Sequence, residues 1–224
     1  MKTKNLSSIN KLDFLISFYI FCIVVAEIMG GKTFPIINNS FLKLNASIGI
    51  FLIPIIYSIN DIITEVYGAQ RTRSIIRISM IILVFLSLFI ILATSLPPSY
   101  RFIKTEPSYD LIFRQSARIT IASLIAFTLS DFLDVLIFVK IRERLGKKAL
   151  WFRTNFSNII SMFIDTVIFL TLAFYTLDKS LSSNVIFLTS LILPYWLLKC
   201  FMSVIETPLV YIGVKWLKHE NKQS

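Results

Sequence analysis

Carboxylates inside apolar stretches are the residues of this sequence whose type and position could do chemistry. They fall within or at the ends of long apolar runs: Glu27, Asp61, Glu65, Asp131, Asp134, Asp165 and Glu206. In a bilayer, a charged and unpaired carboxylate near the centre costs at least about 2.5 kcal/mol. We therefore expect these groups to face a polar cavity, a basic partner or the membrane surface.

The spacing of the polar residues arranges several of these acids in stripes, because residues three and four positions apart share one face of an α-helix. Three such stripes combine acids with amides, hydroxyls and rings: Tyr57, Asp61 and Glu65; Ser123, Phe127, Ser130 and Asp134; and Asn158, Ser161 and Asp165, with Asn155 just before. If the three faces meet, the resulting cavity suits a flat heterocycle rich in N–H donors, since carboxylates accept hydrogen bonds and rings stack. The alternative for the hydroxyls is hydrogen bonding between helices.

Composition places these helices in a membrane. The 224 residues are 55% hydrophobic and 16% charged, with a mean hydropathy of +0.74, which exceeds what one soluble core needs. Six segments reach roughly the 20 residues that a bilayer crossing requires: 13–30, 46–66, 75–95, 117–139, 156–177 and 184–212. We predict an all-α membrane protein, a single domain over residues 1–224 that forms a six-helix transmembrane bundle. Pro194 and Pro208 predict a kink or break in the last segment.

The net charge of +10 is distributed as a topology signal. Most of the 23 lysines and arginines lie in alternate gaps between the apolar runs, on the side of the amino terminus. Since cytoplasmic loops are enriched in these residues, we expect both termini in the cytoplasm and no nucleic acid partner. The stretch 96–115 reads as an outer loop, and Cys22 and Cys200, inside apolar runs, predict no disulfide.

Basic residues close to the acids predict ion pairs. Gly68 is expected to end the second helix, so that Glu65, Arg71 and Arg73 form an inner gate or a helix-end ion-pair network, whereas Asp61 faces the cavity. Further candidates for this gate or ion-pair set are Arg118, Arg153 and Lys199. The alternative for the acids nearest the segment ends is that Glu27, Glu65 and Glu206 reach water or pair with Lys32, Arg71 and Lys199.

An internal repeat connects the fourth and fifth segments. Residues 130–138, SDFLDVLIF, and residues 161–169, SMFIDTVIF, share Ser, Phe, Asp, Ile and Phe at a constant offset. Adjacent segments run in opposite directions, so the repeat places Ser130 with Ser161 and Asp134 with Asp165 on two antiparallel helices, as an inverted pair around a central site would. Chance similarity between two Phe-rich helices is the competing explanation.

Several function classes are disfavoured. The single histidine, His219, lies in the tail, and the sequence contains neither a metal-ligand cluster nor a G-x-S-x-G motif. We therefore expect no enzyme, and no catalytic residue, metal site or cofactor. An asymmetric set of carboxylates also disfavours a cation channel. A membrane interaction protein without transport remains an alternative if the acids simply pair with Arg118, Arg153 and Lys199.

Four strings of this sequence resemble the queuosine precursor transporter family, also called the vitamin uptake transporter family. They are DIITEVYGAQRTR (61–73), RITIASLIAFTLSDFLDVLIF (118–138), WFRTNFSNIISMFIDTVIF (151–169) and Lys199 with TPLVY (207–211). The positions that match the family pattern are Asp61, Glu65, Tyr67, Gly68, Arg73, Arg118, Ser123, Asp134, Arg153, Asn155, Ser157, Asp165, Lys199 and Pro208. Asp131 and Met162 depart from it, because a glutamine is common at both places.

The resemblance implies a multi-pass importer in the bacterial inner membrane that takes up queuosine precursors for tRNA modification. Its substrate would be a deazapurine: 7-cyano- or 7-aminomethyl-7-deazaguanine, or queuine. The expected partners are this small molecule and the lipid bilayer. The layout is also similar to the substrate-binding components of energy-coupling vitamin importers, so a separate ATPase stays open, as does a homodimer.

Overall fold

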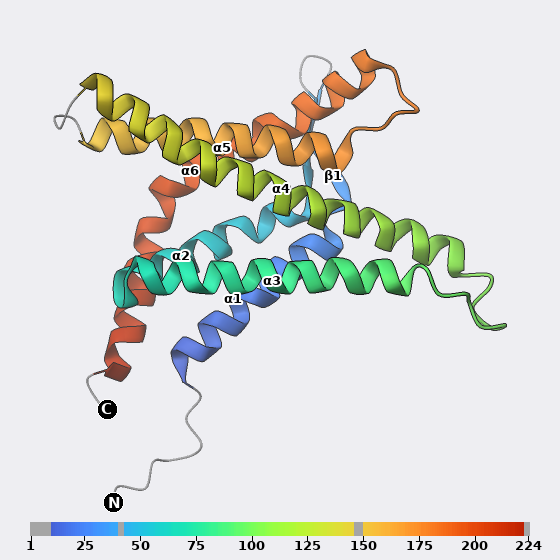
Figure 1. The fold of residues 1–224 in the computed structure, drawn as a ribbon, viewed down its shortest axis with the longest axis horizontal. Coiled ribbons are helices and arrows are strands. Elements are labelled where there is room, and N and C mark those ends of the chain that lie inside the picture. The colour runs from blue at the N-terminus through green and yellow to red at the C-terminus, as the bar shows by residue number, and fades with distance from the viewer. Residues whose placement is uncertain (1–9, 40–42, 146–149, 222–224) are drawn as a thin grey trace, which may run out of the picture.

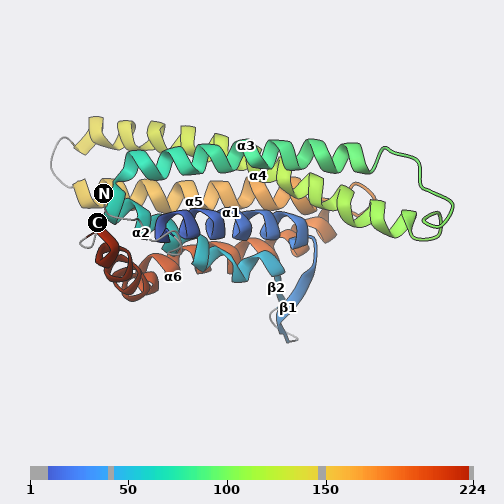
Figure 2. The same cartoon turned by 90° about the horizontal axis from the view of Figure 1, so that it is seen from below.

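The computed structural model describes residues 10–39, 43–145 and 150–221, with side chains except at 131–132, 134–145, 150–158, 202–209 and 219–221. Its helices are α1 (Lys11–Met29), α2 (Ile53–Tyr67), α3 (Ala69–Ala93), α4 (Glu106–Leu145), α5 (Leu150–Phe174) and α6 (Leu181–Asn221). Figures 1 and 2 both show α4 and α5 side by side and running in opposite directions. The start of α1 lies against the end of α6, because the Lys11 ammonium donates a 2.8 Å hydrogen bond to the Trp216 carbonyl. Both ends of the described chain are therefore on the same side of the bundle, and their cytoplasmic location stays a prediction.

A β-hairpin that the sequence analysis did not predict separates α1 from α2. Strand β1 (Thr33–Asn38) pairs antiparallel with β2 (Lys43–Ser47), and a short 3₁₀ helix, η1 (Ile48–Phe51), leads into α2. The predicted span of about 46–66 agrees with the apolar helical segment Ile48–Tyr67, except that its first two residues belong to β2. The Asn45 side chain donates a 2.8 Å hydrogen bond to the Ser190 hydroxyl on α6. This tertiary contact holds the hairpin, and hydrophobic periodicity carries no sign of it.

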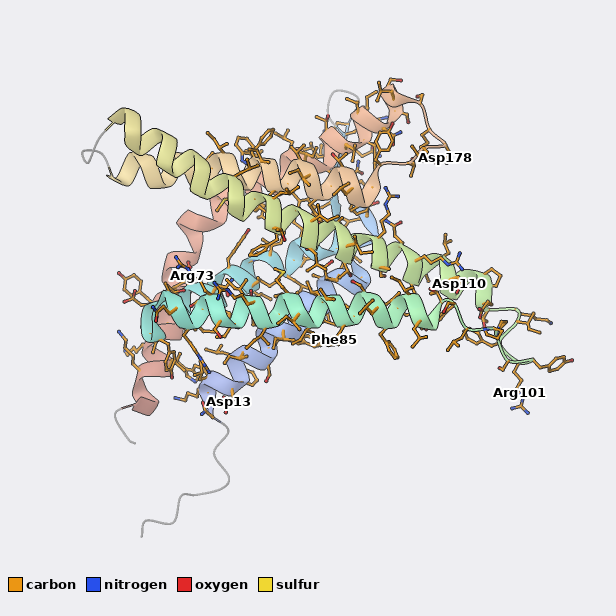
Figure 3. All side chains as sticks on the ribbon, viewed as in Figure 1. Asp13, Arg73, Phe85, Arg101, Asp110 and Asp178 are labelled. Atoms are coloured by element: carbon orange, nitrogen blue, oxygen red, sulfur yellow. The ribbon has the colours of Figure 1, made fainter. Side chains whose placement is uncertain are left out.

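Four helical segments in the described ranges are long and apolar enough to cross a membrane: Lys11–Met29, Ile48–Tyr67, Ala69–Ala93 and Leu181–Phe201. A shorter apolar helix, Ile159–Phe174, lies within α5. Large apolar side chains such as Phe85 and Phe89 on α3 are exposed, as lipid-facing residues should be (Figure 3). The structure thus has several membrane-spanning candidates, and the count of six crossings stays a prediction.

The predicted outer loop 96–115 is only partly a loop, because α4 begins at Glu106. Pro107 suits the first turn of a helix, where its missing N–H has no intrahelical partner in any case. One turn later, Arg114 forms a 2.8 Å ion pair with Asp110, four residues before it. At the other end of the chain, α6 continues past Pro194 to Asn221 and changes direction along its length (Figure 1). This bend agrees with the predicted kink.

Gly68 ends α2 as predicted and leads directly into α3. Its backbone has φ 85° and ψ 159°, a conformation that is essentially restricted to glycine. A Cβ atom there would meet no other atom within 4 Å, so any cost of substitution comes from the backbone alone.

We expect Gly68→Ala to lower the free energy of unfolding by about 1–3 kcal/mol. Thermal unfolding of the purified protein should show it as a lower Tm, by about 2–4 °C for each kcal/mol. Gly49→Ala is the matched control, because a Cβ there would have its nearest contact at 3.6 Å. An unchanged Tm for Gly68→Ala would mean that the connection between α2 and α3 adopts another backbone conformation.

Two apolar clusters hold the bundle together. One joins β2, α4, α5 and α6 and includes Ala46, Ile119 and Leu170. The other joins α1, α2, α3 and the end of α6 and includes Ile63 and Leu217. The region where the two clusters meet is lined by side chains from each of the six described helices.

Candidate functional site

A cavity of about 270 Å³ lies where the two clusters meet. Tyr195 belongs to the first cluster and Tyr19 to the second, and both side chains line the cavity. Its volume is near the lower end of the range for small-molecule sites, about 300 Å³. The cavity therefore suits one compact ligand.

An ion pair between α5 and α6 forms part of the cavity wall. The Lys199 ammonium lies 2.6 Å from the Asp165 carboxylate and donates a second hydrogen bond, of 3.1 Å, to the Thr166 hydroxyl. Lys199 is only 9% exposed, and Tyr57 and Tyr195 interact with it electrostatically. An ammonium has three N–H donors, so these two bonds to described residues leave one for a ligand. Lys199 was predicted for the gate or ion-pair set, and the structure does place it in an ion pair, with Asp165, at the wall of the cavity.

Glu27 on α1 lines the cavity, whereas the sequence analysis listed it among the acids of apolar runs but not among the binding residues. It is 7% exposed, and its Oε2 atom has no hydrogen-bond partner among the described residues. The Ser123 side chain interacts with the same carboxyl group from α4. Its predicted partner, Lys32, is exposed and forms no ion pair with it.

The hairpin explains why an acid so close to a helix end is buried. The Ser47 hydroxyl donates a 2.6 Å hydrogen bond to the Gly30 carbonyl, and the Ile48 N–H donates one of 3.0 Å to the Lys32 carbonyl. These bonds fold β2 and η1 back over the end of α1. The sequence signal for a buried acid was the position of Glu27 in an apolar run. Because Glu27 lies only two residues before the end of α1, the alternative expectation was that it reaches water.

Asn60 on α2 supplies a second polar group without a full set of partners. Its Nδ2 atom donates a 3.4 Å hydrogen bond to the Tyr19 hydroxyl, whereas its Oδ1 atom is buried and has no partner in the described part of the chain. Both residues line the cavity. The cavity thus contains two buried acceptor atoms that the described residues leave unsatisfied.

Four of the predicted binding residues come together at this cavity: Tyr57, Ser123, Phe127 and Asp165. They come from α2, α4 and α5, the three helices whose polar faces were expected to meet. Their role in binding stays a prediction.

Asp61 was also expected in the cavity, but its side chain is exposed and does not line it. The stripe of α2 that lines the cavity is Ile53, Ile56, Tyr57 and Asn60. Asp61 follows Asn60 and is therefore rotated by about 100° around the helix axis. The cavity-lining stripe of α2 therefore includes Asn60 where the sequence analysis expected Asp61.

The repeated serines meet directly at the crossing of α4 and α5. The Ser130 hydroxyl donates a 3.1 Å hydrogen bond to the Ser161 carbonyl, and neither residue lines the cavity. Asp134 and Asp165 each follow their serine by four residues, about 6 Å along a helix. Because α4 and α5 are antiparallel, the two positions lie in opposite directions from the crossing, about 12 Å apart along the helix axes. The backbone therefore separates the two aspartates that were expected to share one central site.

Four further predicted residues have side chains outside the described residues: Asp134, Asn155, Asn158 and Arg153. Asp134 lies on α4, and the other three lie on α5.

The structure does not bring the predicted gate together. Glu65, Arg71 and Arg73 are exposed, and no ion pair joins them in the described part of the chain. Among the described residues Arg118 forms no ion pair either. It donates hydrogen bonds to the carbonyls of Leu172 and Tyr175. These carbonyls lie at the end of α5, where no intrahelical N–H reaches them, so Arg118 caps that helix.

The sequence is similar to a family described as "Putative vitamin uptake transporter", which matches residues 47–213. A relative from Bacillus subtilis (strain 168), called "Probable queuosine precursor transporter", is 26% identical over 208 residues, which are 91% of this chain and 85% of the relative. A relative of the same description from Haemophilus influenzae is 27% identical over 127 residues, 57% of this chain and 51% of the relative. No solved structure matches the chain.

Proposed function

The chain belongs to the vitamin uptake transporter family, the family of the queuosine precursor transporters, and from this premise we propose that it imports queuosine precursors. The proposed substrates are 7-cyano- or 7-aminomethyl-7-deazaguanine, or queuine, and the proposed location is the bacterial inner membrane. The proposed topology has six crossings and both termini in the cytoplasm.

One observation carries this proposal: the cavity combines aromatic rings with buried acceptor atoms that have no hydrogen-bond partner among the described residues. Tyr57 and Phe127 offer ring faces, while Glu27 Oε2 and Asn60 Oδ1 offer unsatisfied acceptors. An unsatisfied buried acceptor is costly, so a ligand that donates N–H groups gains free energy by binding there. A deazaguanine is flat and carries ring N–H groups and an exocyclic amine, which match these features.

The proposed binding roles follow from the position of each group. Phe127 or Tyr57 stacks on the base, the Ser123 hydroxyl contacts its edge, and the pair of Asp165 and Lys199 supplies a charged acceptor and a donor. Asp134 belongs to the proposed pathway on the other side of the α4–α5 crossing. The other predicted polar residues of these helices remain proposals for the same pathway: Asn155, Asn158, Ser130 and Ser161.

An uptake experiment tests the function. Bacterial cells that cannot synthesise or import queuosine precursors would receive this gene, with 7-cyano-7-deazaguanine in the medium. We expect queuosine to appear in their tRNA only when the chain is expressed, because the tRNA-modifying enzymes then receive their substrate.

Cells with intact precursor synthesis are the positive control, since they show that the modifying enzymes work in the absence of the gene. Unmodified tRNA in expressing cells, with the protein present in the membrane, would overturn the proposed function.

A further inference from the structure

We propose that Glu27 determines the specificity of the cavity, by accepting hydrogen bonds from a ring N–H and the adjacent exocyclic amine of the bound base. This pair of donors is the 2-aminopyrimidinone edge that guanine and deazaguanines share. The inference rests on the proposed function and names the contact that would distinguish these bases from their analogues without the amine.

The first support is the unsatisfied carboxylate oxygen. Glu27 is only 7% exposed and lines the cavity. Its Oε2 atom has no hydrogen-bond partner within the described ranges. A carboxylate accepts hydrogen bonds at both oxygens, and contact with Ser123 engages the group from one side. A ligand with two neighbouring N–H donors can therefore complete the coordination of this group.

The second support is the rigid position of the helix end that carries Glu27. The Ser116 hydroxyl on α4 donates a 2.7 Å hydrogen bond to the Ile28 carbonyl, and Ser47 bonds the Gly30 carbonyl from the hairpin. A Cβ atom at Gly30 would lie 2.5 Å from the Ala26 carbonyl oxygen, so the chain turns closely against its own helix there. These contacts fix the backbone that carries Glu27, and a side chain on a rigid element is better preorganised for a ligand.

The third support is the contrast with Asp165, the other described carboxylate of the cavity. Asp165 Oδ2 already accepts the hydrogen bond of Lys199, at 2.6 Å. That pair presents the remaining ammonium donor, which suits a carbonyl oxygen of the base. Glu27 has no such cationic partner among the described residues, so it is the group suited to N–H donors.

Binding of 7-deazaguanine and 7-deazahypoxanthine to the purified protein tests the inference, because the two bases differ in the exocyclic amine alone. The wild type should bind 7-deazaguanine at least about tenfold more tightly, the effect of losing one hydrogen bond to a charged acceptor. Glu27→Gln should weaken binding of 7-deazaguanine by roughly tenfold or more and remove most of the preference, because the amide donors oppose those of the base.

Glu106→Gln is the matched control, since this acid at the start of α4 does not line the cavity, and it should leave both affinities unchanged. Glu27→Asp keeps the charge but shortens the side chain, so it should weaken binding and retain the preference for the amine. If Glu27→Gln does not fold, the affinities of Glu27→Asp test the inference in its place.

A wild type that binds neither base would overturn the proposed function together with the inference. A wild type with the expected preference, and a Glu27→Gln or Glu27→Asp variant whose affinities equal those of the wild type, would overturn the inference alone. Without ligand, Glu27→Gln should unfold at the same temperature as the wild type or a higher one, because it removes an unsatisfied buried carboxylate. This separates loss of a ligand contact from loss of the fold.

Discussion

Asp165→Asn should abolish uptake and lower the free energy of unfolding by about 3–5 kcal/mol. The reason is the partner: Lys199 is 9% exposed, and its ammonium lies 2.6 Å from the Asp165 carboxylate. Without the carboxylate, the buried ammonium would lose its negatively charged partner and keep neutral acceptors such as the Thr166 hydroxyl, together with the electrostatic contacts of the two tyrosines. Thermal unfolding should show a decrease in Tm of roughly 6–20 °C, from about 2–4 °C per kcal/mol.

The double variant Asp165→Asn with Lys199→Met separates stability from function. The double variant contains no unpaired buried charge at this place, which is the main cost of breaking a buried ion pair, so its Tm should return toward the wild-type value. Uptake should stay abolished, since the cavity would have lost the Asp165–Lys199 pair and with it the ammonium donor that we propose for a carbonyl oxygen of the base. Recovery of uptake together with Tm would show that the pair has only a structural role.

Asp178→Asn is the matched control for the single substitution. This aspartate is exposed in the connection between α5 and α6, at the periphery of the molecule (Figure 3). The same change in charge there should alter neither Tm nor uptake.

Phe127→Ala should weaken binding of 7-deazaguanine by roughly 5- to 150-fold, the equivalent of about 1–3 kcal/mol of base stacking on an aromatic ring. Phe127 lies on the cavity-lining face of α4, one turn after Ser123. Its side chain is 38% exposed, so part of the ring is accessible to a ligand. Phe127→Ala removes this ring surface. Isothermal titration of the purified protein measures the change.

Phe127→Tyr should stay close to the wild type, because it keeps the ring face. The matched control is Phe85→Ala, since this ring lies on α3, is 66% exposed and does not line the cavity (Figure 3). If Phe127→Ala bound the base as tightly as Phe85→Ala, the base would not stack on Phe127.

Much of the candidate site could be predicted from helical spacing. Tyr57, Ser123, Phe127 and Asp165 were selected by their periodicity, and they line one cavity. Periodicity works for them because a residue near the middle of a long helix keeps its face whatever surrounds the helix. For Asp61 it failed, since the spacing indicates which residues share a face but not which face meets the cavity.

The repeat was informative in a different way from the one expected. Its serines lie at the crossing of α4 and α5, where Ser130 bonds the Ser161 carbonyl. Its aspartates lie on either side of that crossing. The sequence indicates that two helices are related, but the point at which they cross depends on how the whole pair packs.

The sequence by itself determined the membrane class, the family and the helix stop at Gly68. Each depends on local properties: the length of apolar runs, the order of short motifs, and a backbone conformation that only glycine adopts easily. The tertiary structure alone decided that Glu27 is buried, that Lys199 pairs with Asp165, and that Glu65 stays exposed. The physical reason is that burial and pairing of a polar side chain depend on the segment that packs over it, and here the hairpin and α6 reach the site from elsewhere in the chain.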